Sequence, residues 1–223
     1  MSKELWAQID RYFSDALIPS DAALAAASEA TVAAGLPPIA VSEVQGKLLH
    51  LLARMHQSRS ILEVGTLGGF STIWLARALP ADGRLVTLEL DPKHAQVATA
   101  NIARAGLAKI VEVRLGAAAD SLAQIVKEGG GPFDFIFIDA DKKSIPEYFS
   151  RALELARPGT VIIVDNVVRN GGVIEAGSTD PDIQGVRRFT EMVAKETRVS
   201  GTAIQTVGAK GYDGFALLLV KEL

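Results

Sequence analysis

The sequence predicts an α/β fold, in which a mostly parallel sheet of seven strands is covered by helices on both faces. From residue 60 onward, short apolar runs alternate with segments of helical periodicity, which is typical of a parallel sheet with right-handed crossover connections. Capping residues stand at the starts of the helical segments, and glycine or proline stands at their ends. The chain has 223 residues, 48% of them hydrophobic, which is enough for a substantial core.

The N-terminal part, residues 1–40, is rich in alanine and predicts a helical extension. Breaks are expected at Pro19-Ser20 and at Gly35-Leu36-Pro37-Pro38. A helix should then begin after Ser42, because Gln45 follows at the spacing of a capping box. We find no linker or internal repeat, so we expect one domain over residues 1–223, in which residues 41–223 form the core that follows the helical extension.

The part of the chain after residue 60 predicts seven strands and five helices. The expected strands are 61–64, 85–89, 111–114, 133–138, 161–164, 201–207 and 215–220. The expected helices are 71–79, 92–105, 118–126, 145–156 and about 181–197. Asp91-Pro92 and Gly106 are start and stop signals for the second of these helices, and Ser144 with Glu147 repeats the capping-box spacing before the fourth. The Arg-Pro-Gly sequence at 157–159 should end that helix.

Composition and charge exclude several classes of protein. The net charge is −3, and no basic run is interleaved with aromatic residues, so we expect no nucleic-acid partner. The absence of cysteine excludes disulfides, thiolate metal sites and cysteine nucleophiles. The N-terminus lacks the pattern of a signal peptide, and no apolar stretch is long enough to cross a bilayer. We therefore expect a cytoplasmic protein without a membrane partner.

A glycine-containing loop follows the first expected strand. Gly65, Gly68 and Gly69 could bring the backbone close to a ligand, although a tight turn without a ligand explains them equally well. Their spacing differs from the dinucleotide fingerprint G-x-G-x-x-G. Glu89 ends the second strand, where an acid can accept hydrogen bonds from both ribose hydroxyls; otherwise it is an ordinary exposed acid. Glu63, inside an apolar strand, needs a partner, and either a ligand amino group or a local salt bridge could supply it.

Two strands end on carboxylates. Asp139 follows the strand 133–138, and the pair Asp165-Asn166 follows the strand 161–164. If the two strands are neighbours, the three side chains supply oxygen donors of the kind that Mg²⁺ or Ca²⁺ prefers, with Lys142 one turn away. Taken one by one, such residues are also common as helix caps and in turns.

Together these motifs resemble those of a known family. Glu63-Val64-Gly65-Thr66-Leu67-Gly68-Gly69 matches the E/D-x-G-x-x-x-G motif of class I S-adenosylmethionine-dependent methyltransferases. With FDFIFIDADK, ARPGTVIIVDNVVRNGGV and GYDGFALLL, the chain resembles the cation-dependent O-methyltransferases of the catechol and caffeoyl-coenzyme A type, especially their small bacterial branch. The resemblance implies a Rossmann-like sheet with an antiparallel C-terminal strand. It also implies methyl transfer from S-adenosylmethionine to a hydroxyl of a phenolic, catechol-like vicinal diol.

The resemblance also implies roles for individual residues. Asp139, Asp165 and Asn166 would bind a divalent cation, Mg²⁺ in the first place and Ca²⁺ or Mn²⁺ as alternatives. Lys142 would be the catalytic base and contact the substrate, and Lys143 is the neighbouring alternative, which we interpret as a surface charge. The residues implied in binding S-adenosylmethionine are Val41, Glu63, Gly65, Thr66, Ser71, Glu89, Ala118 and Asp139. Arg169 and Asp213 are candidates for contact with the acceptor, although each could belong to an ordinary turn.

Other residues suggest less. The histidines His50, His56 and His94 fall in expected helices, and we place them away from both strand-end clusters. Trp6 and Trp74 are expected to pack in the interior. The exposed apolar faces expected for the N-terminal helices, and the habit of related enzymes, suggest a homodimer. The alternatives to a methyltransferase are an NAD-type oxidoreductase and a non-catalytic nucleotide-binding module.

Overall fold

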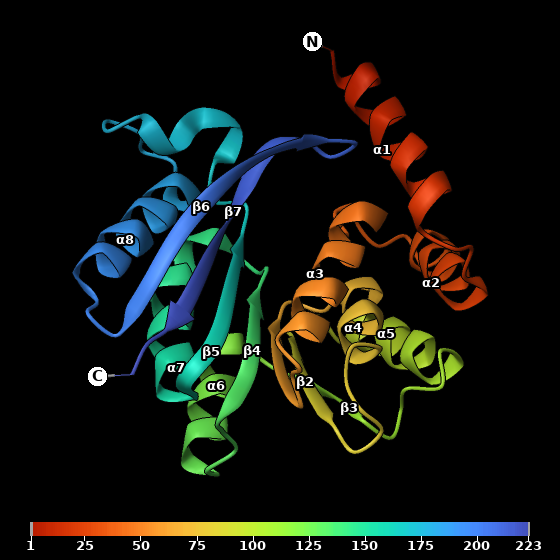
Figure 1. Cartoon of the computed structure of the whole chain (residues 1–223), viewed down its shortest axis with the longest axis horizontal. Coiled ribbons are helices and arrows are strands. Elements are labelled where there is room, and N and C mark those ends of the chain that lie inside the picture. The colour runs from red at the N-terminus through yellow and green to blue at the C-terminus, as the bar shows by residue number, and fades with distance from the viewer. Residues whose placement is uncertain (1, 223) are drawn as a thin grey trace.

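All seven expected strands are present in the computed structural model, which describes residues 2–222. They are β1 (Ser60–Val64), β2 (Arg84–Glu89), β3 (Val111–Leu115), β4 (Phe133–Ile138), β5 (Ala156–Asp165), β6 (Val199–Gly208) and β7 (Gly211–Val220). They form one sheet in the order β3-β2-β1-β4-β5-β7-β6 (Figure 1). β7 runs antiparallel to both of its neighbours, and the other pairings among β1 to β5 are parallel. The predicted Rossmann-like sheet with an antiparallel C-terminal strand is therefore confirmed.

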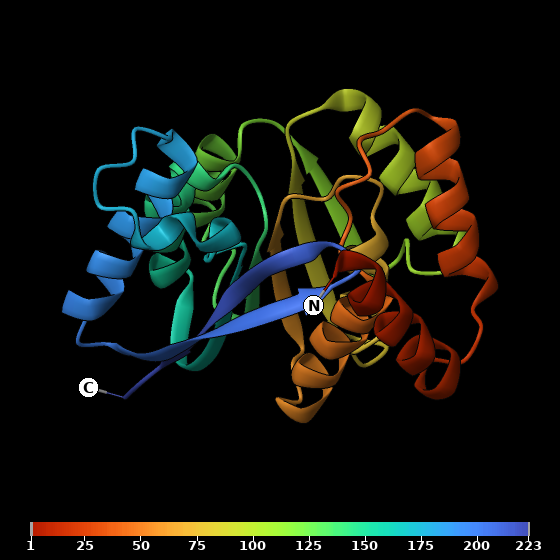
Figure 2. The same ribbon diagram turned by 90° about the horizontal axis from the view of Figure 1, so that it is seen from above.

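Eight α-helices surround the sheet in the described part of the chain. They are α1 (Lys3–Leu17), α2 (Ala22–Ala33), α3 (Glu43–Met55), α4 (Phe70–Ala76), α5 (Pro92–Arg104), α6 (Ala118–Lys127), α7 (Ile145–Glu154) and α8 (Pro181–Lys195). Two short 3₁₀ segments, Lys142–Ser144 and Arg169–Ile174, follow β4 and β5. Figure 2 shows α6, α7 and α8 on one side of the sheet, and α3, α4 and α5 on the other. None of the described helices is long and apolar enough to span a membrane.

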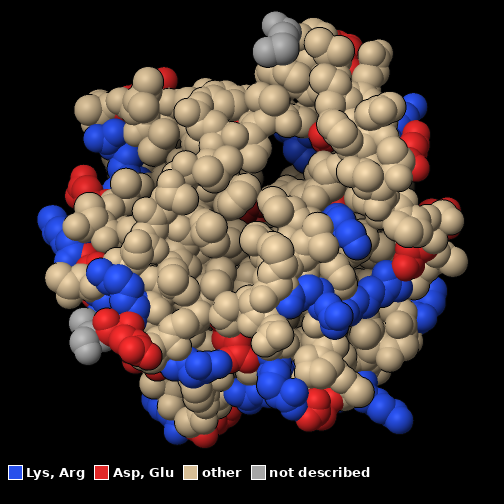
Figure 3. Space-filling view, in the orientation of Figure 1, with Lys and Arg blue, Asp and Glu red and all other residues tan. Residues whose placement is uncertain are grey.

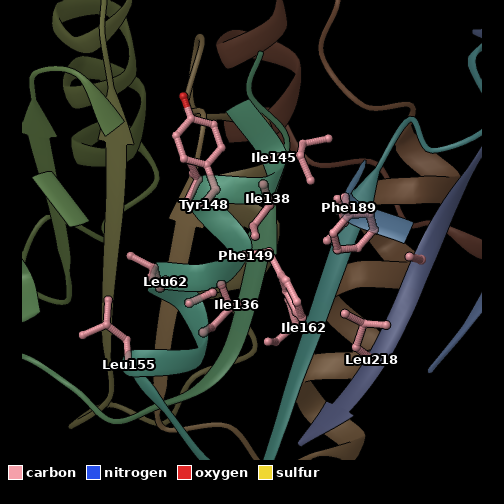
Figure 4. Close-up of a cluster of buried hydrophobic side chains, with 14 of the residues drawn as sticks. Leu62, Ile136, Ile138, Ile145, Tyr148, Phe149, Leu155, Ile162, Phe189 and Leu218 are labelled. Carbon is pink, nitrogen blue, oxygen red and sulfur yellow. The ribbon is translucent and has the colours of Figure 1, made fainter. Parts of the chain in front are cut away.

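The core consists of two apolar clusters, one on each face of the sheet. Because the central parallel strands are covered on both faces, they consist of almost continuous apolar residues. Figure 4 shows the cluster on the α7 side, where Ile136 of β4 and Ile162 of β5 lie beside Phe149 of α7. The ring of Phe149 meets that of Phe189 from α8 edge-to-face, with 5.3 Å between the ring centroids. Trp74 is buried in the other cluster, as predicted.

The predicted caps of α3 and α5 are confirmed, although Gln45 does not complete the capping box of α3, because its side chain donates to Asp165 instead. The Oγ of Ser42 accepts the backbone N–H of Gln45 at 3.3 Å, and Asp91 caps α5 ahead of Pro92. The capping box expected before α7 is wrong. Ser144 accepts no capping hydrogen bond, because its hydroxyl donates to Asp141 and the residues before it form a 3₁₀ turn.

At two places the boundaries differ from the prediction because glycine and proline stand inside strands. β5 begins at Ala156, so the Arg-Pro-Gly sequence at 157–159 belongs to a strand and not to a helix stop. The C-terminal hairpin is longer than predicted, since β6 and β7 pair up to Gly208 and Gly211 and leave a two-residue turn. Tyr212 and Asp213 therefore lie in a strand and not in a connecting loop.

Helix α1 stands apart from this core. None of its residues, all of which lie in the described part of the chain, is buried. Its contact with the hairpin includes a hydrogen bond in which Asp10 accepts the backbone N–H of Ala209 at 2.7 Å. The tip of the β6–β7 hairpin thus extends beyond the sheet and reaches the N-terminal helix α1 (Figure 1).

Candidate active site

The strand register brings the predicted site residues together. Val64 of β1 pairs with Ile138 of β4, and Ile138 pairs with Val164 of β5. The residues that follow β1 and β4 are Gly65 and Asp139, and β5 itself ends on Asp165, so the three lie side by side at one edge of the sheet. This edge is at the carboxyl ends of the parallel strands, where the strand order changes direction and ligands bind in open α/β sheets.

Gly65 is required by a close backbone approach. Its φ is +99°, and a Cβ at this position would overlap the backbone oxygen of Asp139. Only glycine combines this conformation with this proximity at little cost. The glycine loop after β1 therefore lies directly against Asp139, the carboxylate that follows β4.

Glu89 holds the same loop through its carboxylate. Its Oε2 accepts the backbone N–H of Thr66 at 3.2 Å and that of Leu67 at 2.7 Å, while Oε1 accepts the N–H of Asp91 at 3.0 Å. His94 stands beside it, with Nδ1 3.5 Å from Oε1 of Glu89. The placement of His94 away from the strand-end clusters is therefore wrong, because α5 begins directly after β2 and its first turn lies at the ligand-binding edge.

Glu63 is fully buried, and three hydroxyl groups donate hydrogen bonds to it. Ser71 donates at 2.6 Å and Thr87 at 2.7 Å, and Thr72 supplies the third. Burial raises the pKa of Glu63 to about 7, against the lowering effect of these hydrogen bonds, and the charge of Asp139 adds to the increase. Within the chain, three hydroxyl groups and not a local salt bridge are therefore the partners of Glu63.

A cavity of about 750 Å³ opens above this edge of the sheet, a size typical of small-molecule sites. Most predicted site residues line it: Val41, Gly65, Thr66, Ser71, Glu89, Ala118, Asp139, Lys142, Asn166 and Arg169. Residues that sequence reasoning did not select also line it: Thr31, Leu90, His94, Tyr148 and Asp182. The predicted residues from six separate segments of the chain thus share one cavity.

Lys142 is buried, and its ammonium is paired with Asp139, with 2.6 Å from Nζ to Oδ1. The next lysine, Lys143, is exposed and also lines the cavity. Between the two partners, Asp141 accepts hydrogen bonds from Ser144 and from Tyr148. The turn that carries Lys142 is therefore tied to α7.

Asp165 is buried, and each of its oxygens has one donor. Gln45 donates its Nε2–H to Oδ2 at 2.6 Å, and the backbone N–H of Asn166 donates to Oδ1 at 2.7 Å. Burial raises the pKa of Asp165, and the nearby charge of Asp139 raises it further. Asn166 has a φ of +57°, a left-handed conformation that asparagine tolerates better than most residues.

These residues fit a hard divalent cation. The charge of Asp139 raises the pKa of the buried Asp165, so a positive charge beside the two carboxylates would stabilise the site, and the amide of Asn166 adds a third oxygen. Among residues 2–222, no group of three or more acidic or histidine side chains is close enough to bind a metal, so the set depends on this amide.

A second cavity, of about 320 Å³, adjoins the first at Asn166. It lies between α1, α3 and the β6–β7 hairpin, and Asp10, Gln45, Asp165, Tyr212 and Asp213 are among its lining residues. Asp213 also accepts the backbone N–H groups of Val168 and Arg169, both at 3.0 Å. The side chain of Arg169 pairs with Asp182 at 3.3 Å and lines the first cavity. The two candidate acceptor residues therefore face different cavities.

Comparison with known proteins agrees with this architecture. An O-methyltransferase family model matches residues 16–219. A catechol O-methyltransferase of Niastella koreensis is 55% identical over 221 residues, which cover 99% of this chain and all of the relative. The crystal structure of an O-methyltransferase from Bacillus cereus in complex with SAH has a TM-score of 0.98 and 58% identity, covering 99% of this chain and 100% of the other. The O-methyltransferase TomG of Streptomyces achromogenes, in complex with SAM, has a TM-score of 0.96 and 53% identity, with complete coverage of both chains.

The chain belongs to the O-methyltransferase family. The predicted enzyme class, an S-adenosylmethionine-dependent O-methyltransferase, is confirmed. Neither the NAD-type oxidoreductase nor the non-catalytic module receives support from these comparisons.

Proposed function

We propose that this enzyme transfers a methyl group from S-adenosylmethionine to a hydroxyl of a catechol-like small molecule, assisted by a divalent cation. The observation that carries the proposal is the register that sets Gly65, Asp139 and Asp165 side by side, where the two cavities meet at Asn166. The relative from Niastella koreensis is named a catechol O-methyltransferase, which supports the same acceptor class.

The larger cavity is the proposed site of S-adenosylmethionine. Glu89 uses one lone pair on Oε1 for Asp91, which leaves acceptor capacity for ribose hydroxyls. The hydroxyl of Ser71 lies between the cavity and Glu63, so the methionine end of the cofactor would be bound near this pair. SAH and SAM in the structures from Bacillus cereus and Streptomyces achromogenes support this choice of cofactor.

Asp139, Asp165 and Asn166 would hold the cation. When bound, the cation supplies Lewis acidity, which favours ionisation of a diol hydroxyl. Lys142 is the proposed base, because its Nζ lies beside Asp139. In its neutral amine form, Lys142 would accept the proton of a diol hydroxyl bound near Asp139 and become the ammonium that pairs with this carboxylate. The walls of the second cavity would orient the ring of the acceptor, and holding both reactants in attack geometry can supply up to roughly 7–11 kcal/mol of the barrier reduction.

The test is an assay with S-adenosylmethionine, Mg²⁺ and 3,4-dihydroxybenzoate, with and without EDTA, in which the methylated product is detected by mass spectrometry. We expect product with Mg²⁺ and none with EDTA. Equal product in EDTA would overturn the role of the cation. Binding of S-adenosylmethionine without methylation of any tested diol would instead favour the non-catalytic module.

We also propose that the enzyme is a homodimer, and the exposed apolar surface around β6 supports this. Nearly all of β6 is exposed although it carries no charged side chain, and an edge strand of this kind readily pairs with another chain. Figure 3 shows a broad surface without charges over the β6–β7 hairpin. Exposed apolar residues continue this surface onto neighbouring elements: Leu48, Leu51 and Met55 of α3, and Leu5, Ile9 and Phe13 of α1.

Light scattering after gel filtration tests the homodimer. We expect about twice the chain mass of 23.6 kDa. Ile204→Asp on β6 should give the monomer, whereas Leu115→Asp, an exposed apolar residue on the opposite edge strand, should not change the mass. A wild-type monomer at micromolar concentration would contradict the proposal. The cytoplasmic location stays a prediction.

A further inference from the structure

Gln45 makes a contact for which the proposed chemistry has no explicit use. Its amide Nε2 donates a hydrogen bond to Oδ2 of Asp165 at 2.6 Å, while Oδ1 receives the backbone N–H of Asn166 at 2.7 Å. The carboxylate is buried at the end of β5, so these two bonds fix it at both oxygens. Without the Gln45 amide, Oδ2 of Asp165 would lose this hydrogen bond and the carboxylate could rotate.

The packing of α3 holds Gln45 itself in place. Ser42 caps the helix by accepting the backbone N–H of Gln45 at 3.3 Å. The next residue, Gly46, lies so close to Trp74 of α4 that a Cβ there would overlap the indole ring. Because Trp74 is buried, α3 cannot shift away from α4 without opening the core. The position of the Gln45 side chain is thus determined by the fold and not by a flexible loop.

The two carboxylates at the sheet edge differ in the charge of their partners. Asp139 is paired with the ammonium of Lys142 at 2.6 Å, whereas the donors to Asp165 are a neutral amide and a backbone N–H. Asp165 is therefore held in one orientation by neutral donors, which form no ion pair with it. Hydrogen bonds of this kind set the geometry of a ligand carboxylate before a cation binds.

We propose that Gln45 is a positioning residue, which orients Asp165 and thereby sets the affinity of the site for a divalent cation. This inference rests on the cation site of the proposed function. Neutral hydrogen-bond partners of a metal-binding side chain commonly contribute 10–100-fold to metal affinity. Gln45 also lines the second cavity, so it links the wall of the proposed acceptor site to the cation.

The experiment measures cation binding directly. Mn²⁺ is titrated into wild type, Gln45→Leu and Gln45→Ala in a calorimeter, with SAH present and no acceptor. We expect the Kd for Mn²⁺ to rise roughly 10–100-fold in both variants, while the Kd for SAH changes by less than about threefold.

Gln124→Leu is the matched control. Gln124 also donates its Nε2–H to a carboxylate, that of Glu128 at 3.0 Å, but on the exposed face of α6. The Kd of Gln124→Leu for Mn²⁺ should equal that of wild type. If Gln124→Leu lost as much affinity for Mn²⁺ as the Gln45 variants, the inference would be overturned. If wild type binds Mn²⁺ and both Gln45 variants bind it equally well, Gln45 has no positioning role and the cation site still stands. If wild type binds no Mn²⁺, the proposed cation site is wrong and the inference with it.

Discussion

Glu89 and Leu67 are joined by a hydrogen bond of 2.7 Å from the backbone N–H of Leu67 to Oε2 of Glu89. Leu67 has a φ of +50°, a left-handed conformation that costs a residue other than glycine roughly 1–2 kcal/mol. The same oxygen accepts the N–H of Thr66, so one carboxylate fixes both residues of the loop. The acid that sequence reasoning assigns to the ribose thus also maintains the shape of the cofactor loop.

Glu89→Gln should therefore weaken cofactor binding and lower the stability of the folded protein. Glutamine presents one oxygen where three backbone N–H groups now donate, and its NH₂ group would face at least one of them. We expect the free energy of unfolding in urea to fall by about 1–3 kcal/mol, and the Kd for SAH to rise by roughly tenfold or more.

Glu112→Gln provides the control, because Glu112 is exposed on β3 and pairs with the nearby Arg114. The free energy of unfolding and the Kd for SAH of Glu112→Gln should both equal those of wild type. If Glu89→Gln lost stability but bound SAH as tightly as wild type, Glu89 would serve the loop alone and not the ribose.

Gly65 and Gly106 allow the steric and conformational roles of glycine to be separated. Both have positive φ, +99° and +75°, but a Cβ at Gly65 would overlap the oxygen of Asp139, whereas nothing lies within 4 Å of one at Gly106. Gly106→Ala should cost only about 1–2 kcal/mol of stability and leave SAH binding unchanged. Gly65→Ala should cost more than this and should also abolish SAH binding, because β1 and β4 must separate at the cavity. Equal effects of the two substitutions, measured by calorimetry and thermal unfolding, would refute the close approach.

Much of the fold could be predicted because its signals are local. The apolar run at 133–138 and the cap Asp91-Pro92 determine a strand and a helix start from a few adjacent residues. The hairpin was misplaced for the same reason, since Gly208 and Gly214 look like loop residues when read locally. In the structure Gly214 lies in β7, where a Cβ would overlap the backbone oxygen of Ile204, so the glycine reflects packing across strands and not a turn.

The site was predictable where it depends on strand ends and not where it depends on distant contacts. Asp139 and Asp165 could be placed together because neighbouring parallel strands deliver their carboxyl ends to one edge. The bond from Gln45 to Asp165 joins residues 120 positions apart, and no periodicity connects them. Tyr148 falls within the expected helix 145–156, and no local signal marks it, yet its hydroxyl donates to Asp141 beside the cavity, since α7 begins directly after the turn that carries Lys142.

Lys142→Ala should slow turnover by roughly 10²–10⁴-fold, the usual contribution of a general base. Lys143→Ala serves as the matched control, since it removes the same charge one residue away on the exposed surface. It should retain nearly full kcat with the diol substrate. Calorimetry with SAH should give similar Kd values for both variants, because neither side chain holds the adenosyl group in the proposed arrangement. Normal turnover of Lys142→Ala would show that another group takes the proton.

The buried carboxyl of Glu63 should make the protein less stable as the pH rises. Burial, opposed by the hydrogen bonds from Ser71, Thr72 and Thr87 and assisted by the charge of Asp139, raises the pKa of Glu63 from 4.5 to about 7. The folded state therefore keeps a proton between pH 4.5 and 7 that the unfolded state releases. The stabilising effect is complete below pH 4.5 and is lost as the pH rises to 7, by about 3 kcal/mol in total.

Glu63→Gln removes this titration, so its free energy of unfolding relative to wild type should increase from pH 5 to pH 8. Urea unfolding in EDTA without cofactor measures the difference, and subtraction cancels the other groups that titrate in both proteins. Thr72→Val gives a second readout, because it deletes one of the hydroxyl donors to Glu63 while keeping the side-chain volume. Without this donor the pKa of Glu63 should rise further, so the loss of stability should occur at higher pH. If the profiles of wild type and Glu63→Gln ran parallel from pH 5 to pH 8, Glu63 would have to be ionised throughout. The three hydroxyl groups would then stabilise a buried anion without the help of a proton.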